Sequence, residues 1–504
     1  MTAFISSEMM MRKRLNRVEK TDGVKKKGKM SKTGNEEDLK TNGEKKYTGK
    51  ELNVLIVCMT TALTTTFAGS CLNLAVPFIE AEFHMGATAV GWIVTAYMLV
   101  TAALSVPMGS ISARIGIQKG LMIGIAIFAV SSLAAIFSLS GTMVIFMRAV
   151  QGVGAAFLFA TNMAIVVLTF PREKSGEALG LMTAAIYTGL SLGPVLGGLL
   201  IHYLGWRSLF AVMSVISIVA FAVAVKKLEW RNEERGPSHG LDIRGTLLYM
   251  TGIVAAIYGL SEVSVSAYGW MFLAGGCVLL AIFAIAEMHT GDPVVKISIF
   301  VHNKIFTLSN ITALLNYSAI FTISYLLSIY LQVIKGYSSQ AAGLMLAAQP
   351  LVMVVLSPLT GRLSDRVASW KLVTLGMGIC VGVLFVLSRL TLHSPLWIVI
   401  AMLAAAGTGV AFFSSPNTNQ IMSSVGAADK TFASAILSTM RTIGQTTGMA
   451  VVTVIAGMYL GNESLAAAPP AMLVKTVQVC FLVSTVLCIA GTIMSTTRKA
   501  VQKS

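Results

Sequence analysis

The amino-acid sequence predicts an all-α integral membrane protein, and three observations carry this prediction. The chain of 504 residues is 55% hydrophobic and only 12% charged, which leaves too few polar groups to cover a soluble protein. The apolar residues gather in runs of about 20, the length of helix that crosses a bilayer core. Lys and Arg are also spread unevenly between alternate loops. Such runs must be helical because lipid offers no hydrogen-bond partners to the backbone.

The sequence predicts fourteen helical spans separated by short polar segments. With the N-terminus placed inside, 32 of the 38 Lys and Arg residues fall on the inner side and only four, Arg207, Lys335, Arg389 and Lys475, on the outer side. Because Lys and Arg favour cytoplasmic loops, we expect a plasma-membrane protein with both termini in the cytoplasm. The spans lie near residues 52–79, 88–110, 118–138, 142–169, 177–202, 207–226, 243–262, 268–288, 305–333, 340–361, 371–390, 395–416, 431–460 and 471–494.

These spans divide the chain into five predicted segments. Residues 1–50 hold 14 basic and 7 acidic residues and predict a disordered basic cytoplasmic tail. Residues 51–228 predict an N-terminal six-helix bundle, and 291–495 a C-terminal one. Residues 229–290 predict a linker with two inserted helices, and 496–504 a cytoplasmic C-terminal tail.

A motif recurs at the end of the second span of each predicted bundle. GSISARIGIQKG (109–120) and GRLSDRVASWK (361–371) share the pattern Gly-x-(Ile/Leu)-Ser-x-Arg-(Ile/Val), followed by a lysine. The second copy has Asp365 where the first has Ala113. Both copies fall on the predicted inner side, which indicates two parallel repeats. Repeats of this kind are typical of secondary transporters, whose substrate sites lie between the halves.

Two further stretches make a family resemblance specific. They are FMRAVQGVGAA (146–156) in the fourth span and TGLSLGPVLGG (188–198) in the fifth. With the repeated motif, they resemble the major facilitator superfamily, which implies a major-facilitator-type fold of two six-helix bundles, here with two inserted helices. Fourteen spans, WRSLF (206–210) and TMRTIGQTTGMA (439–450) resemble the drug:proton antiporter (multidrug efflux) branch, over residues from about 52 to 494.

The resemblance implies that the repeated motif is a conformational gate on the inner face. In the family its acid bonds a neighbouring helix end and holds the outward-facing state, so Asp365 is expected to have this role. Ala113 cannot accept such a bond, so the first gate is expected to be weaker, or held by Arg114 against helix-end carbonyls. The expected gate residues are Gly109, Arg114, Gly361, Asp365 and Arg366.

The fifth span carries the stretch that resembles the antiporter motif of the family. Gly189, Gly193 and Gly197 lie four residues apart, on one helix face that a neighbouring helix could approach closely. Pro194 removes a backbone donor and is expected to bend the helix. The expected motif residues are Gly189, Gly193, Pro194, Gly197 and Gly198, either at a moving interface or in ordinary tight packing.

The acid that the family usually carries in its first span is missing. Ala68 stands at the acid position, although Asn73 and Pro77 match the family pattern. None of the 22 acidic residues falls in the middle of a predicted span. A buried carboxylate is the usual means of exchanging a proton for substrate, so its absence argues against classical proton coupling.

Two cations, Arg148 and Arg441, fall within predicted spans. A charge there costs on the order of 3 kcal/mol and needs a partner, water or an anionic substrate. Neutral polar and aromatic residues accompany them and favour a neutral or anionic, ring-bearing substrate. The candidates for substrate binding or coupling are Arg148, Arg441, Asn73, Gln151, Tyr97, Asn316, Tyr317 and Gln445.

The sequence therefore predicts a transporter that exports small organic molecules or drugs, with proton antiport implied by the resemblance. The alternative is an importer or facilitator of a neutral or anionic, vitamin-like metabolite without classical proton coupling. We expect the lipid bilayer, a small organic substrate and protons as partners, and a monomer.

Other classes are disfavoured. Gly189-Leu-Ser191-Leu-Gly193 matches a hydrolase nucleophile pattern, but it lies within an apolar span and not on a strand–turn–helix elbow. The six cysteines lie in apolar runs without CxxC spacing. We expect no enzyme activity, cofactor, metal or nucleic-acid binding.

Overall fold

The computed structural model describes residues 47–85, 87–228, 242–263, 267–290, 293–460 and 469–501. In these ranges the chain is helical almost throughout, with no strand, and Gly49–Ser504 form one compact unit. The predicted tail falls almost entirely outside the described residues, as does 229–241 of the predicted linker.

Helices α2 to α7, here called the first half, follow the first six predicted spans. Their ends carry local signals: the Ser140 hydroxyl caps α5 by accepting from the Met143 N–H, and Gly205, with a φ of 78°, ends α6. The bounds are α2 (Gly49–Phe83), α3 (Ala87–Ile115), α4 (Ile117–Ile136), α5 (Gly141–Thr169), α6 (Arg172–Leu204) and α7 (Arg207–Lys227).

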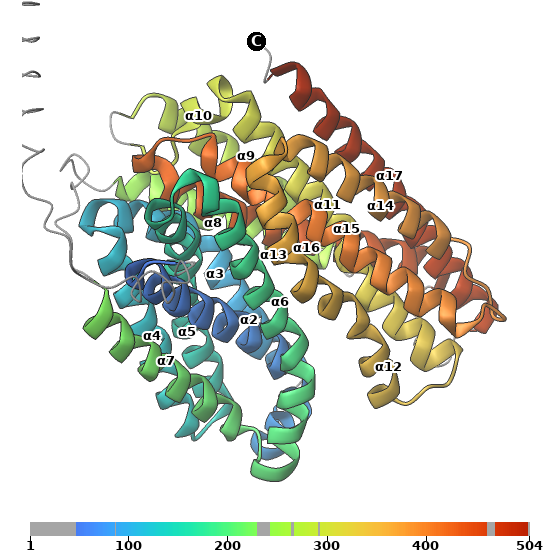
Figure 1. Ribbon diagram of the computed structural model, residues 1–504. Coiled ribbons are helices and arrows are strands. Elements are labelled where there is room, and N and C mark those ends of the chain that lie inside the picture. Colours follow the sequence, from blue (N-terminus) through green and yellow to red (C-terminus); the bar gives the residue numbers. More distant parts are fainter. Residues whose placement is uncertain are drawn as a thin grey trace, which may run out of the picture. The chain divides into compact units, whose positions relative to one another are not determined.

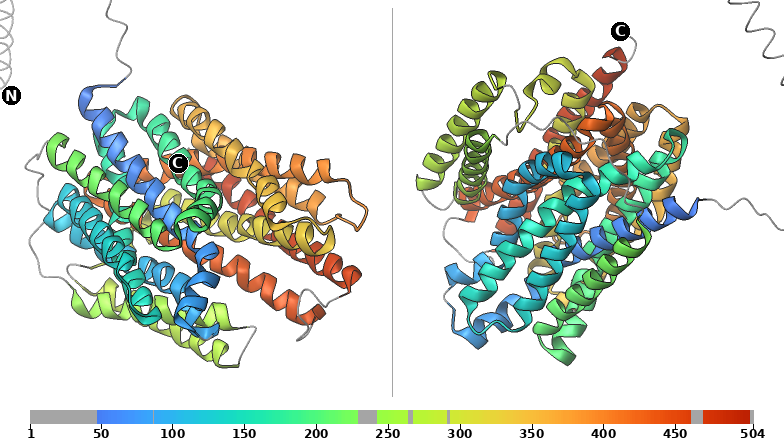
Figure 2. Two further views of the ribbon diagram at one scale, coloured as in Figure 1. Left: turned by 90° about the horizontal axis from the view of Figure 1, so that it is seen from below. Right: turned by 90° about the vertical axis from the view of Figure 1, so that its left-hand side faces the viewer.

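Two further helices, α8 (Ile243–Glu262) and α9 (Ala267–Met288), stand where the inserted pair was predicted. The Asp242 carboxylate caps α8 by accepting from the Gly245 N–H. The two helices pack against each other, and α8 also contacts α3 and α16. The hydroxyl of buried Tyr249 in α8 lies 3.4 Å from the Thr439 hydroxyl in α16. The pair, coloured yellow-green, lies at the periphery in both views of Figure 2.

The remaining helices, α11 to α17, are called the second half. A short helix, α10 (Ile297–His302), precedes them. The second half ends later than predicted, because α17 continues to Val501, past residue 495. Its bounds are α11 (Lys304–Ile329) continuing into the π-helical turn η1 (Tyr330–Ile334), α12 (Ser339–Leu346), α13 (Ala348–Arg366), α14 (Ser369–Leu387), α15 (Leu396–Ser423), the 3-10 turn η2 (Ala427–Asp429), α16 (Lys430–Leu460) and α17 (Pro470–Val501).

Twelve helices of the described part are long and apolar enough to cross a membrane, or up to thirteen if the bent α6 is one span. Helix α6 bends by 42° between Gly193 and Val195. Helix α16 is not among the twelve, and it contains Arg441 and many Thr, Ser and Gly residues along its 31 positions. The predicted count of fourteen spans is therefore not confirmed, although every predicted span has a helical counterpart.

The two halves meet along two sets of helices. Helix α6 packs against α13 and α15, while α16 packs against α3 and α5. In Figure 1, α6 and α13 run between α4 and α7 on one side and α14 and α17 on the other. The hydroxyl of Ser434 in α16 donates to the Phe159 carbonyl in α5 at 2.6 Å, which ties the halves together.

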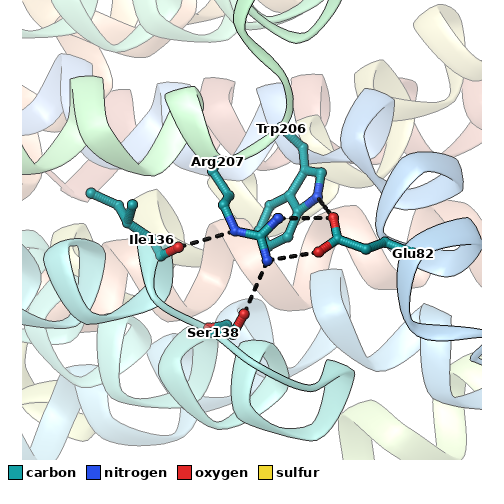
Figure 3. Close-up of polar contacts among 5 residues, drawn as sticks. All are labelled: Glu82, Ile136, Ser138, Trp206 and Arg207. Atoms are coloured by element: carbon teal, nitrogen blue, oxygen red, sulfur yellow. Dashed lines mark hydrogen bonds and ion pairs between the residues drawn. The ribbon is translucent and has the colours of Figure 1, made fainter.

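A polar cluster joins three segments at one end of the first half (Figure 3). The Glu82 carboxylate, at the end of α2, accepts from the Trp206 indole and from the Arg207 guanidinium, both at 2.8 Å. Arg207 also donates to the carbonyls of Ile136, the last residue of α4, and Ser138, just after it, at 3.1 Å each. The WRSLF stretch thus begins α7 with a contact that holds α2 and α4 beside it.

Candidate functional site

A cavity of about 830 Å³ lies between the two halves. Helices α2 and α6 line it from the first half, and α11, α12, α13, α15 and α16 from the second. Most of its lining is aliphatic or aromatic, and none of the described lining residues is Asp or Glu. Its polar lining residues are Tyr187, Ser191, Asn316, Tyr317, Ser324, Gln349, Arg441 and Gln445.

Arg441 is the charged residue of this lining, and aromatic rings from both halves surround it. Its guanidinium carbon lies 5.2 Å from the centre of the Tyr317 ring, a distance at which a cation and a ring attract each other. Tyr187, from α6 of the first half, lines the same cavity. The Phe413 and Tyr317 rings pack edge to face, with 6.3 Å between ring centres. The cavity therefore presents one cation beside one phenol, with a second phenol in the same lining.

Arg148 lies elsewhere, inside the first half. It is fully buried and stacks over the Tyr97 ring at 4.2 Å. Its guanidinium donates to the carbonyls of Ile93 at 3.0 Å and Ala68 at 3.4 Å, and to the Gln151 side chain. These neutral acceptors take the place of the missing acid, so Arg148 is a core residue of the first half.

The eight substrate candidates thus separate into groups. Arg441, Asn316, Tyr317 and Gln445 line the cavity together. Arg148, Tyr97 and Gln151 form the internal cluster, in which the Tyr97 hydroxyl donates to the Thr65 carbonyl at 2.9 Å and the Gln151 amide to the Ser132 hydroxyl at 2.7 Å. The side chain of Asn73 lies outside the described part of the chain.

The second copy of the repeated motif joins the two halves. The Asp365 carboxylate accepts from the backbone N–H of Gly176 at 2.7 Å and of Glu177 at 3.0 Å, in the first turns of α6. An anion is favoured there because the helix dipole makes this end of α6 positive. Arg362 forms an ion pair with Glu177 at 3.0 Å. We call Asp365, Gly176, Glu177 and Arg362 the α6–α13 contact.

Asn419 of α15 extends the α6–α13 contact to a third helix. Its amide donates to the Ser364 hydroxyl at 3.0 Å, and its side-chain oxygen accepts from the Ser175 hydroxyl at 3.2 Å. Ser364 and Asn419 are buried. The helices can approach this closely because glycine has no Cβ atom. A Cβ at Gly176 or Gly180 would collide with α13, and one at Gly361 with α6.

The first copy of the motif meets α16 without an acid. A Cβ at Gly109 would lie 3.2 Å from the Ala435 Cβ and 3.3 Å from the Thr431 carbonyl oxygen. The second copy has the same arrangement, since a Cβ at Gly361 would meet the Gly176 carbonyl. Thr431 is fully buried, and its hydroxyl has no hydrogen-bond partner in the described part of the chain. The two contacts are thus related, but the first has Ala113 at the position where the second has Asp365.

The sequence did not identify all residues of these contacts. Arg366 is exposed, and the ion pair across the α6–α13 contact is made by Arg362, four residues earlier. Gly176 and Gly180 were not recognised because the polar residues around Gly176 mark a helix end. Two glycines four residues apart were the available signal.

The glycines of the fifth span face α2, within the same half. A Cβ at Gly189 would collide with Thr66, and one at Gly193 with Ser70. A Cβ at Gly197 would lie 3.0 Å from the Cys71 Cβ, and Gly198 lines the cavity. The side chain of Pro194 lies outside the described part of the chain. The glycine face therefore serves close packing of α6 on α2, while another face of α6 meets the second half.

The cavity and the α6–α13 contact lie at different levels of the same helices. The contact uses the first turns of α6 and the last turn of α13, while the cavity uses later residues of α6 and the first turns of α13. The halves are thus closed together at one end and separated by the cavity toward the other. This arrangement allows a small molecule to be reached from one side at a time.

Comparisons with known proteins agree with this architecture. Residues 58–449, and again 309–501, match the family model described as Major Facilitator Superfamily. The riboflavin transporter RibZ of Clostridioides difficile is 31% identical over 79% of this chain and 86% of its own length. The multidrug resistance protein Stp of Mycobacterium tuberculosis is 29% identical over 77% of this chain and 73% of its own.

Two more comparisons concern resistance and fold. The methylenomycin A resistance protein of Bacillus subtilis is 27% identical, over 80% of this chain and 87% of its own length. The crystal structure of the human organic anion transporter MFSD10 (TETRAN) superposes with a TM-score of 0.62, over 87% of this chain and 99% of that chain. Its sequence identity is 16%, so this likeness shows the fold alone.

Proposed function

The chain belongs to the Major Facilitator Superfamily as a multi-pass membrane transporter, and from this premise we propose that it exports small organic molecules from the cell. The cavity of about 830 Å³ between the halves carries the proposal, because its size and mainly apolar lining suit a drug-sized molecule. Relatives named as multidrug and methylenomycin A resistance proteins support export as the direction.

The proposed mechanism is alternating access between the two halves, α2 to α7 and α11 to α17. With both termini in the cytoplasm, the α6–α13 contact closes the inner face and the cavity opens outward. Substrate would enter from the inside after this contact separates and leave when it forms again. Helix α16 is included as a fourteenth span, because its 31 residues are long enough to cross a bilayer core even with tilt.

Cysteine labelling tests this topology in intact cells. Cys277 is the exposed native cysteine of the described residues, so Cys277→Ser provides the background. Single cysteines at Leu139 and His393 should react with an impermeant maleimide from outside. A cysteine at Glu173 should react only after the membrane is opened. Outside labelling at Glu173 would contradict both the fourteen-span topology and the direction assigned to the cavity.

A second candidate function is favoured by the missing carboxylates. None of the described residues lining the cavity is acidic, and Ala68 occupies the position where the family usually has an acid. A facilitator of a neutral or anionic metabolite would need no such group. The relative named as a riboflavin transporter supports this candidate.

Transport in inverted vesicles separates the two candidates. The panel contains lipophilic cationic drugs, neutral drugs and riboflavin, each measured with and without an imposed pH gradient, against vesicles lacking the protein. Uptake of drugs that steepens with the gradient supports export by antiport. Equilibration of riboflavin that ignores the gradient favours the facilitator. Transport of none of these compounds would contradict both candidates.

A further inference from the structure

Three polar atoms on residues that line the cavity have no partner. Arg441 Nε is an unpaired donor, while Asn316 Oδ1 and Gln349 Oε1 are unpaired acceptors. All three atoms are buried, and none has a hydrogen-bond partner within the described ranges. Unpaired buried polar groups destabilise a protein unless something else satisfies them. Asn316 is fully buried and its amide donates to Met377 Sδ of α14 at 3.0 Å, so this side chain is held inside the second half. A molecule bound in the cavity with complementary groups would satisfy the Arg441 and Gln349 atoms.

The surroundings of Arg441 distinguish it from the two fully buried arginines, Arg148 and Arg498. Arg148 donates to two carbonyls and Gln151, and Arg498 donates to Asn417, Gln420 and the Leu308 carbonyl. Those two side chains are held within one half each. Arg441 instead faces a space between the halves whose described lining holds no carboxylate. A cation that lines such a space without a counter-ion favours an anion from outside.

Aromatic residues define the shape of the group that Arg441 would receive. Tyr317 lies beside the guanidinium, and Tyr187 and Phe321 line the same cavity. Rings of this kind pack well on the faces and edges of other flat rings. The volume of about 830 Å³ leaves room for several fused rings.

Resting on the transport function proposed above, we infer that the substrates are flat, multi-ring organic anions that also carry an N–H or O–H donor. The anionic group pairs with Arg441, and the donor bonds to Gln349 Oε1. Because Arg441 and Tyr187 come from opposite halves, one bound anion contacts both. Lipophilic cations are disfavoured, since no acidic residue of the described lining offsets them beside Arg441.

Binding of four naphthalene compounds to the purified full-length protein in lipid nanodiscs tests this inference. 6-Hydroxy-2-naphthoate has both the anion and the donor. Its methyl ester removes the charge, 6-methoxy-2-naphthoate removes the donor, and 6-hydroxy-2-naphthylmethylamine reverses the charge. We expect the hydroxynaphthoate to bind about tenfold more tightly than the ester, as a charge-assisted contact implies. We expect the amine to bind more weakly than the ester.

Two variants assign these preferences to atoms. Arg441→Gln should bind the acid and its ester with about equal affinity. The control Arg389→Gln, which removes an exposed Arg, should keep the preference for the acid. In Gln349→Met the preference for the hydroxy over the methoxy compound should shrink. Unchanged unfolding midpoints show that the variants are folded. If Arg441→Gln is not folded, the wild-type ratios and Gln349→Met decide.

Several outcomes would overturn the inference. They are equal or tighter binding of the ester or the amine by the wild type, an unchanged acid preference in folded Arg441→Gln, and no binding of the hydroxynaphthoate up to about 1 mM. The function proposed above is judged separately. Anion binding without transport in vesicles contradicts that function only, whereas transport with a preference for the amine contradicts the anion inference only.

Discussion

The Asp365 carboxylate accepts a hydrogen bond of 2.7 Å from the backbone N–H of Gly176, so an acid of the second half compensates the positive end of a helix from the first. A second bond, from the Glu177 N–H at 3.0 Å, makes the contact bidentate. Because the partners are backbone groups, the bond depends on the relative position of the two halves. It can therefore hold one conformation and be released in another.

We predict that Asp365→Asn opens the α6–α13 contact. Asparagine can accept one of the two bonds, but the charge is lost, so we expect a loss of about 1–2 kcal/mol for the closed state. The fully buried Ser357 of α13 provides a reporter, because Ser357→Cys should react with maleimide only when α6 moves away. The reaction should be roughly tenfold faster with Asp365→Asn, and transport should fall. Equal reaction rates with Asp365→Asn and with the exposed control Arg366→Gln would exclude the proposed role.

We predict that Ala113→Asp creates a matching contact in the first half. Gly109 and Gly361 meet equivalent carbonyls, and residue 113 follows Gly109 as Asp365 follows Gly361, by four positions. The new carboxylate should accept from N–H groups in the first turn of α16. We expect a higher unfolding midpoint and slower transport, because separating the halves then breaks two charged contacts. Ala113→Asn, with nearly the same shape, should have a smaller effect.

Combining the two changes provides the stricter measurement. In the double variant Asp365→Asn/Ala113→Asp, slow labelling at Ser357→Cys should be partly restored, because either contact holds the same face closed. An additive loss of transport with fast labelling would show that the two contacts are independent.

The helices could be predicted because apolar runs and charged loops are local properties of the sequence. A backbone bond from Asp365 to a helix end was expected from the family resemblance, but the sequence did not identify α6 as its partner. The role of Gly176 and Gly180 in close helix packing is apparent only once α13 is seen to cross them. Contacts between distant segments depend on tertiary packing, which a single sequence does not reveal.

Arg148 and Arg441 show the same limit for the candidate site. Both stand in apolar spans within motifs of one family, and nothing local distinguishes them. The difference lies in what surrounds them: Arg148 reaches the carbonyls of Ile93 and Ala68, while Arg441 faces the space between the halves. Arg498 was assigned to a polar tail because three of the last seven residues are basic, yet it is fully buried.

We predict that Gly193→Ala destabilises the protein. Its Cβ would lie 2.8 Å from the Ser70 Cβ and 3.1 Å from the Cys71 backbone nitrogen, so α2 and α6 would have to separate. Overpacking of this kind costs about 1–3 kcal/mol. Gly378→Ala in α14, where a Cβ meets nothing within 4 Å, is the control and should be neutral or slightly stabilising. Equal unfolding midpoints in detergent for the two variants would refute close packing at Gly193.

We predict that the last turns of α17 are required for stability. Arg498 donates to Asn417 Oδ1 at 2.9 Å, Gln420 Oε1 at 3.0 Å and the Leu308 carbonyl at 3.2 Å. A chain ending at Thr497 leaves these acceptors unpaired, at about 1–3 kcal/mol for each buried group. A chain ending at Val501 keeps them and should behave as the full protein does. The yield of monodisperse protein and its unfolding midpoint compare the two, and equal values would contradict the prediction.

The last prediction concerns acid stability at the Glu82–Arg207 pair, which lies beyond the apolar segment Gly49–Leu72 of α2. Hydrogen bonds from the Arg207 and Trp206 side chains to the charged carboxylate hold the pKa of Glu82 below its usual value. The folded protein therefore takes up this proton less readily than the unfolded chain. The stabilisation is complete above the unfolded pKa, about 4.3, and is lost as the pH falls through the lower folded value.

The unfolding midpoint of Glu82→Gln should lie below that of the wild type between about pH 5 and pH 8, and the two should converge toward about pH 3. Glu80→Gln, at an exposed acid two residues earlier, should show no such convergence. A gap between wild type and Glu82→Gln that stays constant down to about pH 3 would mean that the Glu82 charge contributes nothing to the fold.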